Sequence, residues 1–173
     1  MTHLNIEIKA RSQNLDYVRR MLEEQQASFV GLDHQVDTYF KVASGRLKLR
    51  EGNIERALIH YDRPNQAGPK KSIVSLYKIS SDTKLKDILV KSIGVLVVID
   101  KQREIYYIDN IKFHVDQVKG LGDFVEIEAI DEDGSIGEEK LHKQCHSYMK
   151  LLQIKDEDLM QLSYSDLLLQ QQQ

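Results

Sequence analysis

Charged side chains recur at every second position in the segment 98–128. This spacing places side chains on one face of a β-strand. Turn signals at 109–110 and 119–123 divide the segment into three antiparallel runs. The first run carries two cations, the second an acid and the third two acids: Lys101 and Arg103, then Asp116, then Glu126 and Glu128. Neighbouring strands can therefore bring ammonium and guanidinium groups opposite carboxylates.

The same alternation of charged and apolar residues occurs in three earlier segments, 4–11, 46–51 and 55–63. Their charged faces carry, in chain order, Glu7, Lys9, Arg46, Lys48, Arg50 and Arg63. Rows of like charge along a strand cost free energy unless counter-charges or a ligand offset them. A curved or closed sheet with a polar, ligand-holding interior fits this pattern better than a solvated sheet face.

The mixture of cations and carboxylates indicates the kind of ligand. Lysine and arginine supply many donors for phosphate oxygens, and arginine can bind them with two parallel hydrogen bonds. Carboxylates repel phosphate, so their presence beside the cations indicates a bridging hard cation, Mg²⁺ or Mn²⁺. The cations outnumber what one phosphate needs. We therefore expect an oligophosphate, such as a nucleoside triphosphate or tripolyphosphate.

The remaining segments supply the elements that must position these side chains. Further strands are expected at 36–42 and 73–79, and a loop at 63–69, which contains both prolines. Apolar residues at helical spacing predict a helix capped by Ser12 or Asn14 and ended by Gly31, a second capped by Ser80 or Ser81 and ended near Gly94, a third at 136–152, and a short helix or extended segment at 156–169. Each helix has one apolar stripe, so we expect the helices to pack on the outside of the sheet.

Composition limits the class of protein. A chain of 173 residues is expected to form one domain, and a net charge of -3 gives no global signal for nucleic acid or an anionic membrane as partner. The single cysteine, Cys145, excludes an internal disulfide and suits a reducing compartment. The N-terminus shows no secretion signal, and the most apolar stretch, 93–99, is too short to span a bilayer. We expect a cytoplasmic protein.

The histidines form no pair with convincing metal-ligand spacing. We expect His34, His60 and His142 to be packing or surface residues. His114 differs, because it shares a strand face with Asp116. It is the one histidine that could contribute to a site.

Four short motifs, taken in order, carry a family resemblance. The first is Asn5-Ile6-Glu7-Ile8-Lys9, followed by the basic strand at 46–51. The segment 98–128 adds Asp100-Lys101-Gln102-Arg103, Val115-Asp116 and the glycine-containing run 120–128, and a C-terminal match follows at 163–168. With these motifs the chain resembles the CYTH-domain family, or triphosphate tunnel metalloenzymes, over nearly its whole length. The segment 98–128 is most similar to class IV adenylate cyclases.

The resemblance implies an α+β fold, an eight-stranded antiparallel β-barrel that forms a tunnel with a charged interior and helices outside. It implies a single domain at 1–169, followed by a polar tail at 170–173 that we expect to be disordered. The implied triphosphate-binding residues are Lys9, Arg46, Lys48, Arg50, Arg63, Lys101 and Arg103. The implied ligands of Mg²⁺ or Mn²⁺ are Glu7, Asp116, Glu126 and Glu128.

The implied activity is metal-dependent processing of ATP or another triphosphate compound. Conversion of ATP to cyclic AMP and pyrophosphate is favoured, and hydrolysis of tripolyphosphate, thiamine triphosphate or a nucleoside triphosphate is the alternative. A third alternative is a binder without catalysis, because Asn5 stands where the family motif has a glutamate. The catalytic base is not assigned. Edge pairing or an external apolar patch could also support a homodimer.

Overall fold

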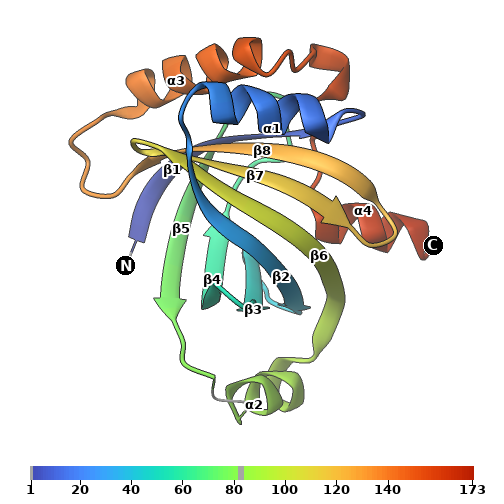
Figure 1. The fold of residues 1–173 in the computed structure, drawn as a ribbon. Coiled ribbons are helices and arrows are strands. Elements are labelled where there is room, and N and C mark those ends of the chain that lie inside the picture. Colours follow the sequence, from blue (N-terminus) through green and yellow to red (C-terminus); the bar gives the residue numbers. More distant parts are fainter. Residues whose placement is uncertain (1, 82–83) are drawn as a thin grey trace.

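Eight antiparallel strands close into one barrel, in the order β1-β5-β4-β3-β2-β6-β7-β8 (Figure 1). The computed structural model describes residues 2–81 and 84–173. The strands are β1 Thr2–Arg11, β2 Ser28–Phe40, β3 Arg46–Glu51, β4 Arg56–Asp62, β5 Lys70–Lys78, β6 Val95–Ile108, β7 Ile111–Val118 and β8 Gly122–Asp131. The helices are α1 Leu15–Glu24, α2 Lys84–Ile93, α3 Glu138–Leu151 and α4 Tyr164–Gln171, with a 3₁₀ turn at Asp156–Asp158. The predicted α+β class and eight-stranded antiparallel barrel are confirmed.

The period of two along the strands separates an apolar outer face from a charged inner face. On β1, the side chains of Ile6, Ile8 and Ala10 are almost fully buried, in one core with the apolar stripes of α1 and α3. Both helices lie over the part of the barrel formed by β1, β7 and β8 (Figure 1). Burying one such aliphatic side chain stabilises the fold by roughly 1.5–3 kcal/mol. This outer core holds the strand register, and hence the inward direction of Glu7 and Lys9.

The boundary between α1 and β2 differs from the prediction. Asn14 caps α1 as expected, because its side chain accepts a hydrogen bond of 3.0 Å from the backbone N–H of Tyr17. The helix ends at Glu24, however, and Gly31 lies inside β2, at a shift in the pairing of β2 with β6. The prediction that Gly31 ends the helix is therefore wrong. The strand β2 begins at Ser28, eight residues before the predicted position 36.

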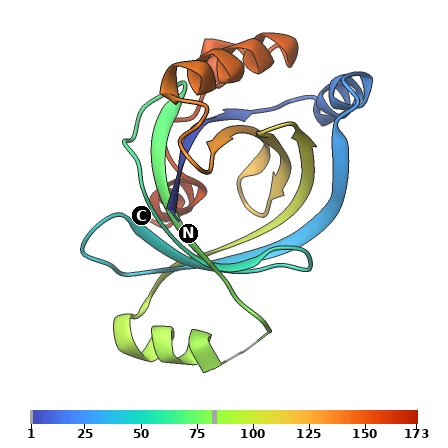
Figure 2. The same ribbon diagram turned by 90° about the vertical axis from the view of Figure 1, so that its left-hand side faces the viewer.

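The helix α2 does not cover the barrel wall. None of its described residues is buried, Ile88 is 59% exposed, and the helix lies beyond one end of the barrel (Figure 2). The prediction that this helix packs on the outer face of the sheet is therefore wrong. It connects β5 to β6, which lie four places apart in the ring of eight strands, so this connection must cross the barrel end. Its predicted cap at Ser80 or Ser81 adjoins residues 82–83, which lie outside the described residues.

The C-terminal helix α4 lies near one end of the barrel and packs against β6 (Figure 1). Its first turn is closed by a capping box in which the Ser163 hydroxyl accepts from the Asp166 N–H, and the Asp166 carboxylate accepts from the Ser163 N–H. The helix extends to Gln171, two residues into the closing glutamine run. In the described part of the chain, no helix has the length and apolarity needed to cross a membrane.

Candidate active site

The barrel encloses a cavity of about 580 Å³, within the range of small-molecule sites. The cavity wall includes nine of the residues predicted to bind triphosphate or metal: Glu7, Lys9, Lys48, Arg50, Arg63, Lys101, Arg103, Glu126 and Glu128. Their Cα atoms are spread from the first strand to the last. Barrel closure, rather than closeness in sequence, brings their side chains to one cavity.

A cluster of three cations surrounds one buried carboxylate, Asp37 of β2. Arg50 donates two hydrogen bonds to it, each 2.9 Å long. The ammonium groups of Lys101 and Lys48 lie 2.8 and 3.1 Å from the same carboxylate. Burial by itself would raise the pKa of Asp37, but Arg50, Lys101 and Lys48 hold that pKa well below its usual value. Asp37 therefore remains ionised and holds the three cations in place.

A second carboxylate, Glu55, joins this cluster. Its oxygens accept a 3.0 Å hydrogen bond from Arg50 and a contact from the ammonium group of Lys112. Together Lys48, Arg50, Lys101 and Lys112 supply four positive charges against the two negative charges of Asp37 and Glu55. This part of the wall, hereafter the cationic wall, therefore has an excess of two positive charges when Lys101 is protonated and of one when Lys101 is neutral.

Burial has a clear effect on Lys101. Its side chain is 2% exposed, and burial lowers its pKa to about 7, with Arg103 and Arg50 contributing in the same direction and Asp37 opposing them. Phosphate oxygens near this ammonium group would favour its charged form and raise that pKa again. The protonation of Lys101 is thus sensitive to whether an anion occupies the cavity.

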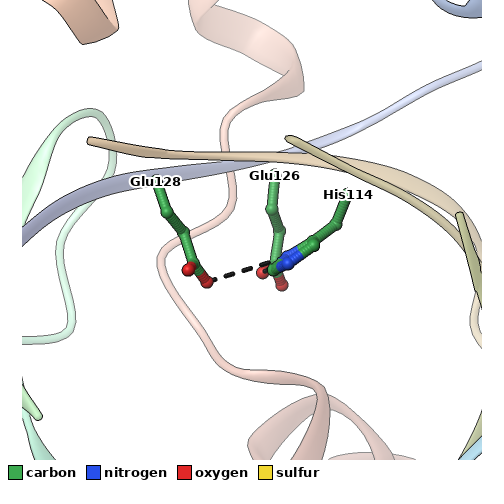
Figure 3. Close-up of side chains that lie close together, drawn as sticks. All are labelled: His114, Glu126 and Glu128. Carbon is green, nitrogen blue, oxygen red and sulfur yellow. Dashed lines mark hydrogen bonds and ion pairs between the residues drawn. The ribbon is translucent and has the colours of Figure 1, made fainter. Parts of the chain in front are cut away.

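His114, Glu126 and Glu128 form an acidic cluster on β7 and β8 (Figure 3). The possible ligand atoms of these side chains all lie within 4.8 Å of one another. Nδ1 of His114 lies 3.1 Å from Glu126 and 3.7 Å from Glu128. The other ring nitrogen, Nε2, is buried without a hydrogen-bond partner among the described residues. Two carboxylates and an imidazole form a donor set that fits a divalent metal ion.

The acidic cluster lies across the barrel from Lys48 and Arg50 but directly beside Lys112, which is opposite Glu128 in the pairing of β7 with β8. Glu126 and Glu128 belong to β8, whereas Lys48 and Arg50 belong to β3, and these strands are four places apart in the ring of eight. Lys9 links the acidic cluster to the rest of the interior through a 2.8 Å ion pair with Glu126. Arg103 also lies 3.4 Å from Glu126, so basic side chains surround the acidic cluster as well as the opposite strands.

Two predicted site residues lie outside the cavity wall. Arg46 forms a 2.8 Å ion pair with Asp166 of α4 at the barrel end. Asp116, predicted as a metal ligand, is fully buried, accepts hydrogen bonds from Arg103 through both oxygens, and accepts a 2.7 Å bond from the Tyr164 hydroxyl. In this structure Asp116 orients Arg103 rather than facing the open cavity.

Glu7 lines the cavity, and its carboxylate is paired with Arg63. The neighbouring inward residue Asn5 is 4% exposed, and its Oδ1 makes no hydrogen bond among the described residues. Asn5 thus lines the same cavity as the charged residues of its motif. A neutral amide stands at this point of the wall, next to an acid that an arginine already neutralises.

Sequence reasoning missed four charged or aromatic residues of the interior: Asp37, Glu55, Lys112 and Tyr164. Asp37 follows Asp33 and Gln35 at a period of two, and all three are fully buried. The predicted strand 36–42 included Asp37, but it began too late to include Asp33 and Gln35, so the alternation of the three residues was missed. Tyr164 could not be found by strand periodicity, because it comes from α4, and its ring lies 3.5 Å from the Lys9 ammonium group.

Comparison with solved structures supports the same architecture. The PH1012 protein of Pyrococcus horikoshii OT3 is similar over 94% of this chain and 98% of its own, with 24% identity and a TM-score of 0.76. An adenylate cyclase candidate from Vibrio parahaemolyticus aligns over 95% and 97%, with 16% identity and a TM-score of 0.74. HpAC1 of Hippeastrum, an adenylyl cyclase candidate with a dominant triphosphatase activity, aligns over 98% and 95%, with 14% identity and a TM-score of 0.61.

At these identities the structural likeness shows the fold. A search of curated proteins gave no match. The model of the CYTH domain family, in contrast, matches residues 3–164, which contain the eight strands except the first residue of β1, and the first residue of α4. This match agrees with the motif order in the sequence and with the closed barrel in the structure. The chain belongs to the CYTH domain family.

Proposed function

We propose that this protein is a divalent-metal-dependent enzyme that processes triphosphate compounds. The observation that carries the proposal is one cavity in the barrel whose wall combines the cationic wall with the carboxylates and imidazole of the acidic cluster. An oligophosphate chain needs several cations, and its bridging metal needs carboxylates. Such a cavity can hold both the oligophosphate chain and the metal ion. Family membership and the two candidate cyclases among the similar structures support the same activity.

The phosphate oxygens would be bound by the predicted cations that line the cavity. Lys48, Arg50 and Lys101 are held in position by Asp37, and Arg103 is held by Asp116. These ion pairs fix the donors before a ligand arrives, so little reorganisation is needed on binding. Arg46, which lies at the barrel end with Asp166, would act only if the ligand extends to that end.

The metal would be held by Glu126 and Glu128 together with His114. When bound there, Mg²⁺ or Mn²⁺ would supply positive charge that neutralises phosphate oxygens and promotes attack at phosphorus. Glu7 and Asp116 remain predicted ligands, although each is paired with an arginine in this structure. Asp116 could reach a metal only by loosening its pair, because both of its oxygens are bonded to Arg103, whereas only Oε1 of Glu7 is paired.

Within this activity we favour conversion of ATP to cyclic AMP. In this reaction the ribose 3′-hydroxyl oxygen forms a bond to the α-phosphorus, the hydroxyl proton is released, and the bond to the bridging oxygen of the pyrophosphate breaks. The resemblance of segment 98–128 to class IV adenylate cyclases favours this reaction, and an apolar strip in the cavity wall, formed by Ile59, Val74 and Leu76, favours an organic substrate. An apolar wall suits an organic group attached to the phosphate chain better than inorganic tripolyphosphate. Hydrolysis of an organic triphosphate uses the same cavity and is the alternative.

Product analysis separates these reactions. Purified protein would be incubated with ATP, thiamine triphosphate or tripolyphosphate, each with Mg²⁺ and with Mn²⁺. We expect cyclic AMP and pyrophosphate in equal amounts from ATP. Orthophosphate without cyclic AMP would overturn the cyclase assignment and support hydrolysis. Tight binding of all three compounds without any product would contradict the assignment as an enzyme. The protein would then be a triphosphate binder without catalysis.

The metal site leads to a prediction about metal preference. Mg²⁺ takes oxygen ligands, whereas transition metals also accept an imidazole nitrogen. The change His114→Gln should therefore weaken Mn²⁺ binding by roughly tenfold and Mg²⁺ binding much less. Calorimetric titration would measure both affinities, and electron paramagnetic resonance would detect nitrogen coupling to bound Mn²⁺ in the wild type. His60→Gln is a matched control, since His60 does not line the cavity. Equal effects on both metals would contradict a role for the imidazole.

We also propose a cytoplasmic location, on the basis of the single, buried and unpaired thiol of Cys145. A partner role for nucleic acid is not proposed, because the net charge is -3. The homodimer stays a prediction.

A further inference from the structure

Besides Arg63 and His114, three polar side chains of the cavity wall contain an atom that makes no hydrogen bond among the described residues. These atoms are Nδ1 of His3, Oδ1 of Asn5 and Oγ of Ser72. Asn5 is 4% exposed and Ser72 is fully buried. All three side chains line the cavity.

The three residues lie together on two neighbouring strands. Asn5 of β1 is directly opposite Ser72 of β5, and His3 is opposite Val74. Because residues two apart share a strand face, His3 and Asn5 point to the same side of β1, and Ser72 and Val74 to the same side of β5. The polar atoms therefore form one patch, bordered along β5 by the apolar strip that contains Val74.

Unpartnered buried polar groups are destabilising, and folded proteins contain few of them. A group of three in one cavity wall is therefore a sign of a ligand that supplies the missing hydrogen bonds. Water in the cavity could satisfy such atoms in the free protein, and a ligand with matching groups would replace it. The position of the patch, inside the cavity, gives a ligand access to it.

The chemistry of the patch differs from that of the rest of the interior. An amide and a hydroxyl carry no charge, and each contains both donors and acceptors, as does a neutral imidazole. On β1 the next inward residue is Glu7, which is already neutralised by Arg63. Such a surface matches hydroxyl, amide or ring-nitrogen groups rather than phosphate oxygens.

We propose that His3, Asn5 and Ser72 form a neutral subsite for the hydrogen-bonding organic group of the substrate, which makes the protein select organic triphosphates over inorganic tripolyphosphate. The subsite rests on the proposed function, since it lies beside the cavity wall assigned to the phosphate chain. It also gives Asn5 a role: the residue binds the organic group instead of a metal ion.

Binding without turnover tests this subsite. The affinities of ATP, GTP, CTP, UTP, thiamine triphosphate and tripolyphosphate would be measured by calorimetry in the presence of EDTA. We expect at least one organic triphosphate to bind more tightly than tripolyphosphate. Ser72→Ala should weaken the binding of that compound by roughly three- to tenfold, the value of one hydrogen bond, and leave tripolyphosphate unchanged.

Thr38→Val is the matched control. Thr38 also has a buried hydroxyl without a hydrogen-bond partner among the described residues, but it does not line the cavity. Removing either hydroxyl should leave the unfolding temperature at or above that of the wild type, because no hydrogen bond is lost. Only Ser72→Ala should change ligand affinity. A separate titration with Mn²⁺ alone should give the same affinity for Asn5→Ala and the wild type.

The outcomes separate this inference from the proposed function. If tripolyphosphate binds as tightly as every organic compound, or if Ser72→Ala keeps the original preference, the subsite is overturned while triphosphate binding stands. If Asn5→Ala loses Mn²⁺ binding, Asn5 is a metal ligand and its role in the subsite is overturned. If no compound binds the wild type either in EDTA or with Mg²⁺ present, the proposed function fails, and the subsite fails with it.

Discussion

Replacing Asp37 with asparagine is expected to lower the free energy of unfolding by about 3–5 kcal/mol, the usual cost of removing one partner from a buried ion pair. The side chain keeps its size, but Arg50, Lys101 and Lys48 lose the carboxylate that neutralises them. Urea unfolding at pH 7 would measure the loss. Tripolyphosphate should stabilise the variant more than the wild type, because phosphate oxygens can replace the missing carboxylate.

The effect of Asp37→Asn should depend on pH in a defined direction. The pKa of Asp37 in the folded protein is well below its usual value, so the ionised carboxylate stabilises the fold above the unfolded pKa of about 3.9. This contribution is lost as pH falls from that value through the folded pKa. The difference between wild type and variant should therefore shrink as pH falls below about 4.

A surface ion pair provides the comparison for Asp37. Glu138 and Lys71 are 2.8 Å apart, with both side chains nearly half exposed. Glu138→Gln should lower the free energy of unfolding far less than Asp37→Asn does, because water screens the pair. An equally small cost for Asp37→Asn would contradict its assignment as the residue that holds the cationic wall together.

Glu126→Gln is expected to lower the turnover of the preferred triphosphate by on the order of 100-fold or more. Glu126 contacts the Lys9 ammonium group at 2.8 Å and His114 at 3.1 Å, and it belongs to the proposed metal site. An amide keeps the shape of the side chain but removes the charge that a divalent cation requires. Steady-state kinetics over a range of metal concentrations would measure the loss, and Mn²⁺ titration without substrate would show weaker metal binding.

A matched variant on the outside of the barrel controls for the charge change. Glu104 of β6 pairs with Arg19 of α1 at 2.7 Å, away from the cavity wall. Glu104→Gln should leave turnover and Mn²⁺ affinity near the wild-type values. If Glu126→Gln keeps full turnover and full metal affinity while the protein remains folded, the acidic cluster is not the metal site.

Local patterns in the sequence predicted much of the barrel because strand and helix periods act over a few residues. The sequence alone was enough to assign Lys48 and Arg50 to one face of a strand. It was also enough to assign the apolar residues around Leu141 to one face of a helix. The exceptions have long-range causes. The early start of β2 depends on its pairing with β6, and the position of α2 depends on which strands it must connect.

The candidate site was predicted less completely than the fold. Nine predicted residues line the cavity, but Asp37 and Tyr164 did not stand out, because their importance comes from partners on other elements. For Asp116 the sequence predicted a role in the site that its partners in the structure do not match. Its sequence position indicated a metal ligand, whereas the structure shows both of its oxygens on Arg103.

The sequence by itself determined which side chains could point inward, and that these side chains combine cations with carboxylates. It did so because the period of a strand sorts residues into two faces without reference to the rest of the fold. Only the tertiary structure decided which charges neutralise one another and which remain available to a ligand. That distribution depends on distances across the barrel, where Asp37 holds three cations on one side and Glu126 and Glu128 lie on the other.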